Sequence, residues 1–352
     1  MEKDQKYMKL ALSQAEKGRY QTWKNPMVGA VIVKDNQVLA TGYHHRYGQI
    51  HAERDAISKL TPEQLFNSTL YVTLEPCNHY GKQPPCSDLI IKNKIKRVVI
   101  GQIDPHKLVT GKGVAKLKAH GIEVVTRVLE KDCQALNKFY SYFYQNEKPW
   151  ITVKQATSLD YRVNATPNTR TAITNHAVYD LVHRERAKYQ AIMIGSTTAI
   201  VDNPSLLTTV KSDYPPIRLV IDRRGRLFDH LNLKLLTDQK APTWIFTQNP
   251  KLADPKLAAN VKVIELQTSD FTEVVNYLTE NEIQSVYVEG GPTLSRAVIK
   301  SRFATDFIEY LNPQFLGKNG QSALVPDQNI ELKNLEIENL AGNLRIAGEI
   351  NV

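Results

Sequence analysis

The spacing of apolar residues in the first part of the chain predicts helices that alternate with strands. Apolar side chains recur at i, i+3, i+4 and i+7 between Met8 and Ala15, which predicts an amphipathic helix over residues 3–18. Short apolar runs bounded by turn residues predict strands. On these grounds we expect strands at 28–33, 37–41, 70–74 and 97–101, and helices at 51–60, 87–93 and 112–120.

The alternation restarts after a polar segment, Gln145 to Pro149, that ends in proline. Beyond it we expect strands at 151–156, 191–195, 217–222, 243–247, 261–266 and 285–289, and helices at 176–188, 271–280 and 293–301. Strands alternating with helices are typical of layered α/β domains. The pattern therefore predicts two such domains, residues 1–146 and 147–352.

Composition narrows the class of protein. The chain has 352 residues, of which 42% are hydrophobic and 23% charged, as in ordinary globular proteins. No apolar run approaches the roughly 18 residues of a membrane span, and the charged N-terminus lacks the apolar core of a secretory signal. Three cysteines cannot form a disulfide framework in such a length, which favours a cytoplasmic protein.

The positive charge lies entirely in the first domain. Residues 1–146 contain 22 Lys and Arg against 13 Asp and Glu, a net +9, whereas residues 147–352 contain 23 of each sign and are neutral. Such a field favours anionic partners, either phosphorylated small molecules or nucleic acid. A solvated surface that keeps the protein in solution explains the same charge.

Three residues of the first domain predict a catalytic metal site. His51 is followed by Cys77, after a proline, and by Cys86 nine residues later. One imidazole and two thiolates leave the fourth position of a tetrahedral zinc ion open for water, whose pKa the metal lowers towards neutrality. Glu53, two residues from His51, can then carry a proton from water to a departing amine. This His-x-Glu and Pro-Cys pattern is typical of zinc deaminases.

Each of these residues also has an ordinary structural explanation. His-Ala-Glu triplets occur by chance, and a buried cysteine is usually a small core residue. The metal interpretation is favoured because two of the three cysteines stand beside prolines in one segment downstream of the triplet. Cys133 lies in a helical pattern without a partner, and we expect it to pack in the core.

The segment that contains both cysteines resembles a known family, and eight residues separate the two thiols where nucleic-acid and nucleoside deaminases usually have two. The segment from Glu75 to Cys86 strongly resembles the deaminase half of the bifunctional riboflavin-biosynthesis deaminase/reductases, as do the segments 25–29, 104–105 and 111–113. The resemblance implies a cytidine-deaminase-like three-layer domain, with His51, Cys77 and Cys86 as zinc ligands and Glu53 as the proton shuttle. It further implies a pyrimidinone substrate that carries a ribosyl phosphate.

The resemblance continues through the second domain, from the segment 154–160 to the Gly-Gly-Pro turn at 290–292. It implies a dihydrofolate-reductase-like fold that binds NADPH and passes a hydride to the ribosyl side chain. The residues it implies for the cofactor are Ala156, Thr198, Asp202, Gly291, Pro292 and Thr293, and those for the substrate are Arg186, Leu206 and Glu289. The glycines alone fit either phosphate binding or an ordinary turn, and no Gly-x-Gly-x-x-Gly motif follows a strand.

Several positions depart from the family pattern. His106 and Thr209 stand where the family usually has an asparagine and a basic residue, and Ala172 stands where it commonly has a tryptophan. Tyr161 replaces a glycine, so we expect the tight turn there to be rebuilt. Arg170 or Lys211 are candidates to replace the missing cation at Thr209.

The sequence thus predicts a bifunctional enzyme that requires Zn²⁺ and NADPH and acts on a phosphorylated small molecule. We expect a homo-oligomer that binds neither nucleic acid nor a membrane. Two alternatives remain open at this point: a deaminase of bases in RNA or nucleosides, and a deaminase whose second domain is a degenerate binding module.

Overall fold

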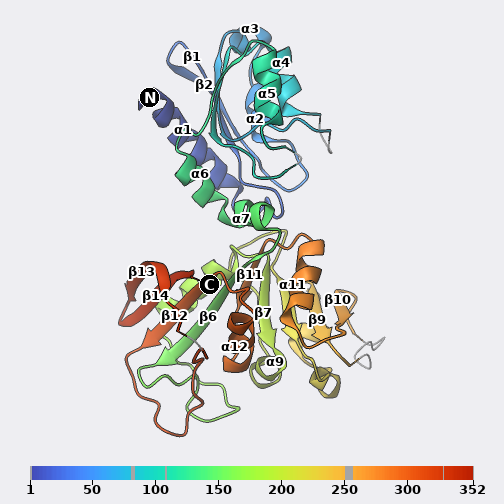
Figure 1. Ribbon diagram of the computed structural model, residues 1–352, viewed down its shortest axis with the longest axis vertical. Coiled ribbons are helices and arrows are strands. Elements are labelled where there is room, and N and C mark those ends of the chain that lie inside the picture. Colours follow the sequence, from blue (N-terminus) through green and yellow to red (C-terminus); the bar gives the residue numbers. More distant parts are fainter. Residues whose placement is uncertain (1, 81–83, 108, 250–256, 328, 352) are drawn as a thin grey trace. The chain divides into compact units, whose positions relative to one another are not determined.

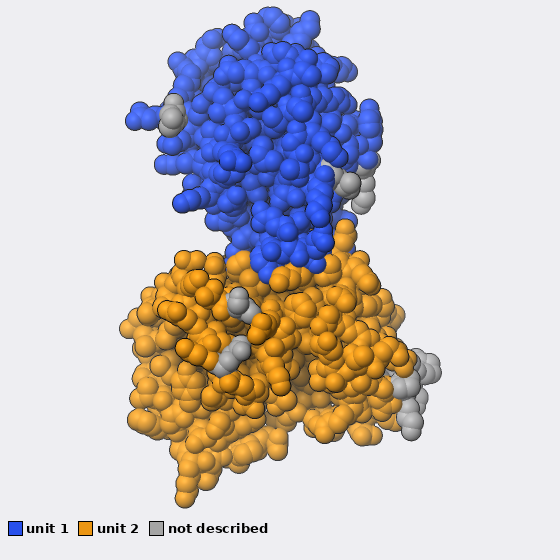
Figure 2. All heavy atoms as spheres, viewed as in Figure 1, with its two compact units in different colours: residues 1–147 blue, residues 148–352 orange. Residues whose placement is uncertain are grey.

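The chain folds into two compact units, residues 1–147 and 148–352 (Figures 1 and 2). The domain boundary expected from the sequence, after residue 146, lies one residue before this one. The computed structural model describes residues 2–80, 84–107, 109–249, 257–327 and 329–351. None of the described helices has the length and apolar character that crossing a bilayer requires.

Unit 1 is built on a five-stranded sheet with the order β2-β1-β3-β4-β5. The hairpin β1–β2 is antiparallel and β1 also pairs antiparallel with β3, whereas β3, β4 and β5 run parallel. The strands are β1 (Gly29–Lys34), β2 (Gln37–Tyr43), β3 (Thr69–Leu74), β4 (Arg97–Gln102) and β5 (Glu123–Val125). Side chains that alternate along these strands therefore feed two separate cores, one on each face of the sheet.

Helices cover both faces of this sheet and give a three-layer unit (Figure 1). The apolar stripe of α1 packs on one face around Met8, Val31 and Val99, and Cys133 is buried in the same core. Helices α2, α4 and α5 lie over the other face. The helices are α1 (Glu2–Ala15), η1 (Glu16–Gly18), α2 (Ala52–Ile57), α3 (Pro62–Leu65), α4 (Cys86–Lys92), α5 (Lys112–Ala119), α6 (Glu130–Leu136) and α7 (Lys138–Asn146).

Unit 2 is built on a nine-stranded sheet with the order β10-β9-β8-β7-β11-β6-β12-β14-β13. The strands from β10 to β12 in this order run parallel, and β14 and β13 complete the sheet antiparallel. The strands are β6 (Trp150–Ser158), β7 (Ala191–Gly195), β8 (Ile217–Ile221), β9 (Thr243–Thr247), β10 (Val261–Glu265), β11 (Ser285–Val288), β12 (Asp306–Asn312), β13 (Leu332–Leu340) and β14 (Asn343–Ile350).

The parallel strands are nearly continuous apolar runs because both of their faces are covered. Helices α11 and α12 enclose one core, and α9 with the segments around η2 and α10 encloses the other. The helices are α8 (His176–Arg186), α9 (Ser196–Asp202), η2 (Arg226–His230), α10 (Lys234–Thr237), α11 (Phe271–Glu280) and α12 (Pro292–Lys300).

All the strands and helices expected from the pattern are present, and their ends differ by a few residues. The pattern missed β5, β12, β13 and β14. Strand β13 shows why, because most of its side chains are exposed and its sequence is largely polar, so it has no apolar alternation. The pattern did not predict the short helices α3, α7, α9 and α10, which have four to nine residues. It indicated α6 only as a helical pattern around Cys133.

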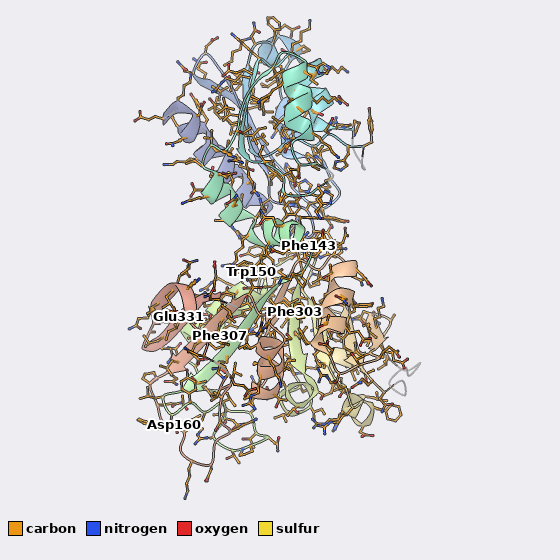
Figure 3. All side chains as sticks on the ribbon, in the orientation of Figure 1. Phe143, Trp150, Asp160, Phe303, Phe307 and Glu331 are labelled. Carbon is orange, nitrogen blue, oxygen red and sulfur yellow. The ribbon has the colours of Figure 1, made fainter. Side chains whose placement is uncertain are left out.

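The expectation that the turn at Tyr161 is rebuilt is wrong. Tyr161 adopts a φ of 57°, the left-handed conformation that a glycine adopts freely. Asp160, labelled in Figure 3, anchors this loop: its carboxylate accepts the Ser158 hydroxyl at 2.6 Å and the N–H groups of Leu316 and Gly317. These bonds hold the turn, so tertiary contacts offset the local strain.

Gly29 offers a direct test of the packing in unit 1. A Cβ at this position would lie 1.9 Å from the Ala11 carbonyl oxygen, so α1 could not stay on β1. We expect Gly29→Ala to destabilise unit 1 by more than about 3 kcal/mol, the range of severe core overpacking. Chemical denaturation followed by circular dichroism measures this effect.

Gly121→Ala is the matched control. This position has a φ of 76° but nothing within 4 Å of its Cβ direction, so only backbone strain of about 1 kcal/mol is expected. Equal stabilities of the two variants would contradict the packing described here.

Candidate metal centre and candidate cofactor site

Three elements of unit 1 bring the predicted metal ligands together. His51 is the residue before α2, Cys77 follows β3, and Cys86 is the first residue of α4. The His51 Nδ1 atom lies 3.5 Å from the Cys77 Sγ and 3.4 Å from the Cys86 Sγ. Ligand atoms bound to one tetrahedral zinc ion lie about 3.3 to 3.8 Å apart, so these three atoms fit such an ion. Their donor types suit it as well.

The pKa values of the two thiols are shifted in opposite directions. The hydrogen bond with Cys86, together with His51, lowers the pKa of Cys77 to about 4. The pKa of Cys86 is raised because it donates to that thiolate and is buried. The backbone N–H of Cys86 also points at the Cys77 Sγ, at 3.3 Å. Cys77 is therefore the thiol that gives up its proton more readily, and a bound cation would favour the thiolate form of both cysteines.

Glu53 lies beside the metal ligands in the first turn of α2 and is 3% exposed. Burial raises the pKa of its carboxyl, and a hydrogen bond to Cys86 opposes this shift. A carboxyl whose pKa is raised towards neutrality can both accept and return a proton. The structure therefore brings together the predicted ligands and the predicted shuttle.

The sequence favours a surface or substrate-facing position for His44, but the structure buries this histidine beside the ligands. His44 places its ring against that of His51, with 5.8 Å between centroids, and burial lowers its pKa. Its Nδ1 lies 2.9 Å from the Ile50 carbonyl and its Nε2 lies 3.0 Å from the Asn25 amide. A neutral ring that donates from Nδ1 must accept at Nε2, so His44 orients Asn25 beside the metal centre.

Two carboxylates of low exposure, Glu75 and Asp104, fix the segment between β4 and α5 next to the Pro-Cys pair. Glu75, just before the Pro-Cys pair, accepts the N–H groups of Gly111 at 2.9 Å and Val114 at 3.1 Å. Asp104 accepts the Tyr140 hydroxyl at 3.0 Å, and burial raises its pKa to about 6. The signal in the sequence was an acid within two residues of the end of each of the buried strands β3 and β4. Residues 81–83 of the cysteine loop lie outside the described residues.

In unit 2 the structure joins two residues predicted for the substrate. The Arg186 guanidinium at the end of α8 donates to the Glu289 carboxylate after β11, at 2.6 Å from Nη2 and 2.9 Å from Nε. The Glu289 side chain is 6% exposed, and the pair holds the pKa of its carboxyl below the usual value despite burial. A buried carboxylate and a partly buried guanidinium thus neutralise each other at the carboxyl edge of the sheet.

Lys154 is a further charged group near the Arg186–Glu289 pair. The sequence signal for it is a lysine in the middle of an apolar strand. It lies on β6, on the same face as Ala156, with its ammonium 5.6 Å from the ring centroid of Tyr310. Burial lowers its pKa, while Glu289 counteracts that shift. A desolvated ammonium of this kind holds its proton less tightly than an exposed lysine.

The residues predicted for the cofactor follow neighbouring parallel strands. Thr198 lies in α9 after β7, and Gly291 precedes α12 after β11; a Cβ on Gly291 would lie 4.0 Å from the Thr198 Oγ1. Pro292 and Thr293 open α12, and Gly291 leaves room for an anion at that helix start. This open cradle fits a dinucleotide phosphate.

Asp202 and Leu206, predicted for cofactor and substrate, differ in how far their side chains are buried. Asp202 ends α9, one turn after Thr198, and burial raises its pKa while the charge of Arg170 lowers it. Leu206 has a φ of 50° and its side chain is 3% exposed in the core. Only its backbone is therefore available to a ligand. Thr209 is exposed, and of the two candidate replacements for a cation Arg170 is the one whose charge acts on Asp202.

Comparisons with known proteins identify both domains. Residues 149–345 match the RibD C-terminal domain family, and residues 1–102 match the cytidine and deoxycytidylate deaminase zinc-binding region. The riboflavin biosynthesis protein RibD of Bacillus amyloliquefaciens is 38% identical over 331 residues, which cover 92% of this chain and 88% of that protein. The chain belongs to the RibD family.

Solved structures of RibD proteins have the same architecture over the whole chain. RibD of Acinetobacter baumannii is 32% identical, with a TM-score of 0.91 and coverage of 100% of this chain and 99% of the other. A Thermotoga maritima diaminohydroxyphosphoribosylaminopyrimidine deaminase/5-amino-6-(5-phosphoribosylamino)uracil reductase is 31% identical, with a TM-score of 0.88 and 99% coverage of both chains. The predicted α/β fold class, the zinc deaminase and the NADPH-dependent reductase are confirmed by this membership.

Metal content tests the ligand set directly. We expect the purified protein to hold about one zinc ion per chain, and Cys77→Ser or Cys86→Ser to lower this content at least tenfold, because two ligands bind zinc weakly. Mass-spectrometric metal analysis gives the value.

Cys133→Ala is the matched control, since this thiol is buried away from the ligands in the α1 core. Zinc lost equally from all three variants, or retained by all three, would contradict the assignment.

Proposed function

We propose that this RibD-family chain carries out two successive steps of riboflavin biosynthesis. Unit 1 replaces an amino group of the diaminopyrimidinone ribosyl phosphate by oxygen and releases ammonia. Unit 2 then reduces the ribosyl side chain to a ribityl chain with NADPH. The observation that carries the proposal is the convergence of His51, Cys77 and Cys86 beside the buried Glu53, on a chain whose second unit is a RibD reductase domain.

In the deamination step, the main task of the protein side chains is to transfer a proton. When bound by His51, Cys77 and Cys86, zinc supplies an activated water as the nucleophile. Glu53 accepts a proton from the water and delivers it to the amine that leaves, which its raised pKa favours. Asn25, whose amide is held by the His44 ring, is our candidate for a contact with the substrate.

The reduction step needs binding and orientation by unit 2. NADPH supplies the hydride, which passes to C1 of the ring-opened ribosylamine. Arg186 and Glu289 bind the substrate as a fixed ion pair, and Lys154 offers an ammonium of lowered pKa on the face of β6 that also carries Ala156. Ala156, Thr198, Asp202 and residues 291–293 line the cofactor.

We also propose that the chain forms a homo-oligomer in the cytoplasm, with a phosphorylated pyrimidine as its ligand and no nucleic acid or membrane as partner. Strand β13 supports the oligomer, because it is an edge strand with exposed Leu335 and Ile337. Two thiolate ligands support a reducing compartment.

Glu53→Gln separates the two activities. The amide cannot accept a proton, so we expect ammonia release to fall by at least about 10³-fold, the upper range for loss of a general base. Zinc content and NADPH oxidation with the deaminated substrate should be unchanged.

Glu63→Gln, which neutralises an exposed carboxylate of the same unit, is the control and should behave as wild type. Undiminished ammonia release in Glu53→Gln would refute the assigned shuttle.

Glu289→Gln makes the reciprocal test in unit 2. It leaves the buried Arg186 without its counter-ion, and we expect kcat/KM of reduction to fall by about 10 to 100-fold, the value of a charged hydrogen bond. Ammonia release should not change.

Glu265→Gln alters an exposed acid at the end of β10 and serves as the control. Normal reduction by Glu289→Gln would remove this pair from the substrate site.

A further inference from the structure

Unit 2 contains a second ion pair of low exposure that neither proposed reaction uses. The Arg345 guanidinium of β14 donates to the Glu185 carboxylate of α8, at 3.1 Å from Nε and 3.0 Å from Nη2. The exposed fractions of the Glu185 and Arg345 side chains are 7% and 11%. Two exposed carboxylates of β13, Glu336 and Glu338, lie 3.4 Å and 3.2 Å from the same guanidinium. The desolvation of a buried pair offsets much of its attraction, so stability alone does not account for it.

Glu185 also accepts hydrogen bonds from two tyrosines. Its Oε2 atom accepts the Tyr310 hydroxyl of β12 at 2.6 Å and the Tyr287 hydroxyl of β11 at 2.8 Å, whereas Oε1 accepts the guanidinium. Both tyrosines are fully buried. Strands β11 and β12 are the two neighbours of β6 in the sheet. One carboxylate with four donors thus fixes a tyrosine on each side of β6.

The Tyr310 ring connects this carboxylate to Lys154. Lys154 lies on β6, and its ammonium is 5.6 Å from the ring centroid of Tyr310. At this distance the face of an aromatic ring attracts a cation. Because Glu185 holds the hydroxyl of the same ring, it fixes the surface on which the ammonium lies.

The last turn of α8 carries both ion pairs of this region. Glu185 and Arg186 are its consecutive final residues, and successive side chains of a helix point about 100° apart. One side chain therefore reaches Arg345 on β14 and the other reaches Glu289 after β11. The pair that binds the substrate and the pair that holds Tyr310 share the same helical turn.

Charged groups from each element packed around β6 act on Lys154. They are Glu185 and Arg186 on α8, Glu289 after β11, and Glu309 on β12, which also contributes the Tyr310 hydroxyl. Burial lowers the pKa of Lys154, the three carboxylates raise it, and the guanidinium of α8 lowers it. The negative charge of Glu185 thus favours the protonated amine, and its own partner on β14 neutralises part of that charge.

We propose that Glu185 is a positioning residue of the reductase site and that Arg345 sets how strongly it acts. Glu185 holds the Tyr310 ring against the Lys154 ammonium and supplies a negative charge beside it. Arg345 reduces this charge from the C-terminal hairpin β13–β14, which is thereby linked to the site. This inference rests on the proposed reduction by unit 2.

The pH dependence of reduction tests the proposal, with the whole zinc-loaded protein, the deaminated substrate and NADPH. We expect kcat/KM of the wild type to fall on the alkaline side, where Lys154 loses its proton. In Glu185→Gln this fall should move to lower pH by about 0.5 to 1 pH unit, because a charge that favours the ammonium is gone. Arg345→Met removes the opposite charge and should move the fall to higher pH. A merely structural role of the ion pair predicts no such opposite shifts.

Glu185→Leu separates the position of the ring from the charge. Leucine and glutamine both remove the charge, so both variants should shift the pH profile equally. The amide oxygen of glutamine still accepts the tyrosine hydroxyls, whereas leucine leaves them buried without an acceptor. Below the alkaline fall we therefore expect kcat/KM to drop by about two- to threefold in Glu185→Gln and by about 10 to 100-fold in Glu185→Leu, mainly in kcat.

Glu331→Gln is the matched control for charge. Glu331, labelled in Figure 3, is exposed and directly precedes β13, so this variant should match wild type in rate and in pH profile. Calorimetric titration with NADPH checks the fold of unit 2 in each variant, and the affinity should stay within about twofold of wild type. If the leucine variant does not fold, the opposite shifts of Glu185→Gln and Arg345→Met decide.

The outcomes distinguish this inference from the proposed function. If wild type does not reduce the deaminated substrate with NADPH, the proposed function of unit 2 is wrong. If it does, pH shifts of the same sign in Glu185→Gln and Arg345→Met, or no shift in either, overturn the inference. A wild-type profile without an alkaline fall overturns it as well.

Discussion

Parallel pairing of strands is the constraint on which both sites depend. In unit 1, β3 and β4 run parallel, so Cys77 and Asp104 emerge at the same edge of the sheet. In unit 2 the parallel neighbours β6, β11 and β7 deliver Lys154, Glu289 and Thr198 to one edge. Loops and helix starts at such an edge expose N–H groups and polar side chains while the strands behind them stay apolar. Residues distant in sequence become neighbours for this reason.

Burial then gives these side chains their chemistry. Glu53 is desolvated and its pKa rises, which makes its carboxyl a proton carrier. Glu289 is desolvated as well, but the Arg186 guanidinium keeps its pKa low, so this carboxylate stays charged and binds. The same residue type thus has two roles that differ only in the neighbouring charge. Burial also changes Lys154, whose pKa it lowers while the charge of Glu289 acts in the opposite direction.

The sequence predicted more of unit 1 than of unit 2, for physical reasons. A zinc site needs a few specific ligands whose types and spacing are visible in the chain, so His51, Cys77 and Cys86 could be named. The dinucleotide site is formed largely by backbone and by strand order, which no single motif records. Lys154 lacked a partner in the sequence because Glu289 lies 135 positions further on, as the difference 289 − 154 shows. Tyr161 has a left-handed conformation because the adjacent Asp160 accepts N–H groups of Leu316 and Gly317, which are distant in sequence.

The central claim is that one chain couples zinc-dependent deamination to NADPH-dependent reduction in that order. Mass spectrometry of the products formed from the diaminopyrimidinone ribosyl phosphate, with and without NADPH, tests it most directly. Without NADPH the account predicts that the reaction stops at the deaminated ribosylamino compound, and with NADPH that it proceeds to the ribitylamino compound. A reduced product that retains the amino group, or NADPH oxidation without ammonia release, would contradict it.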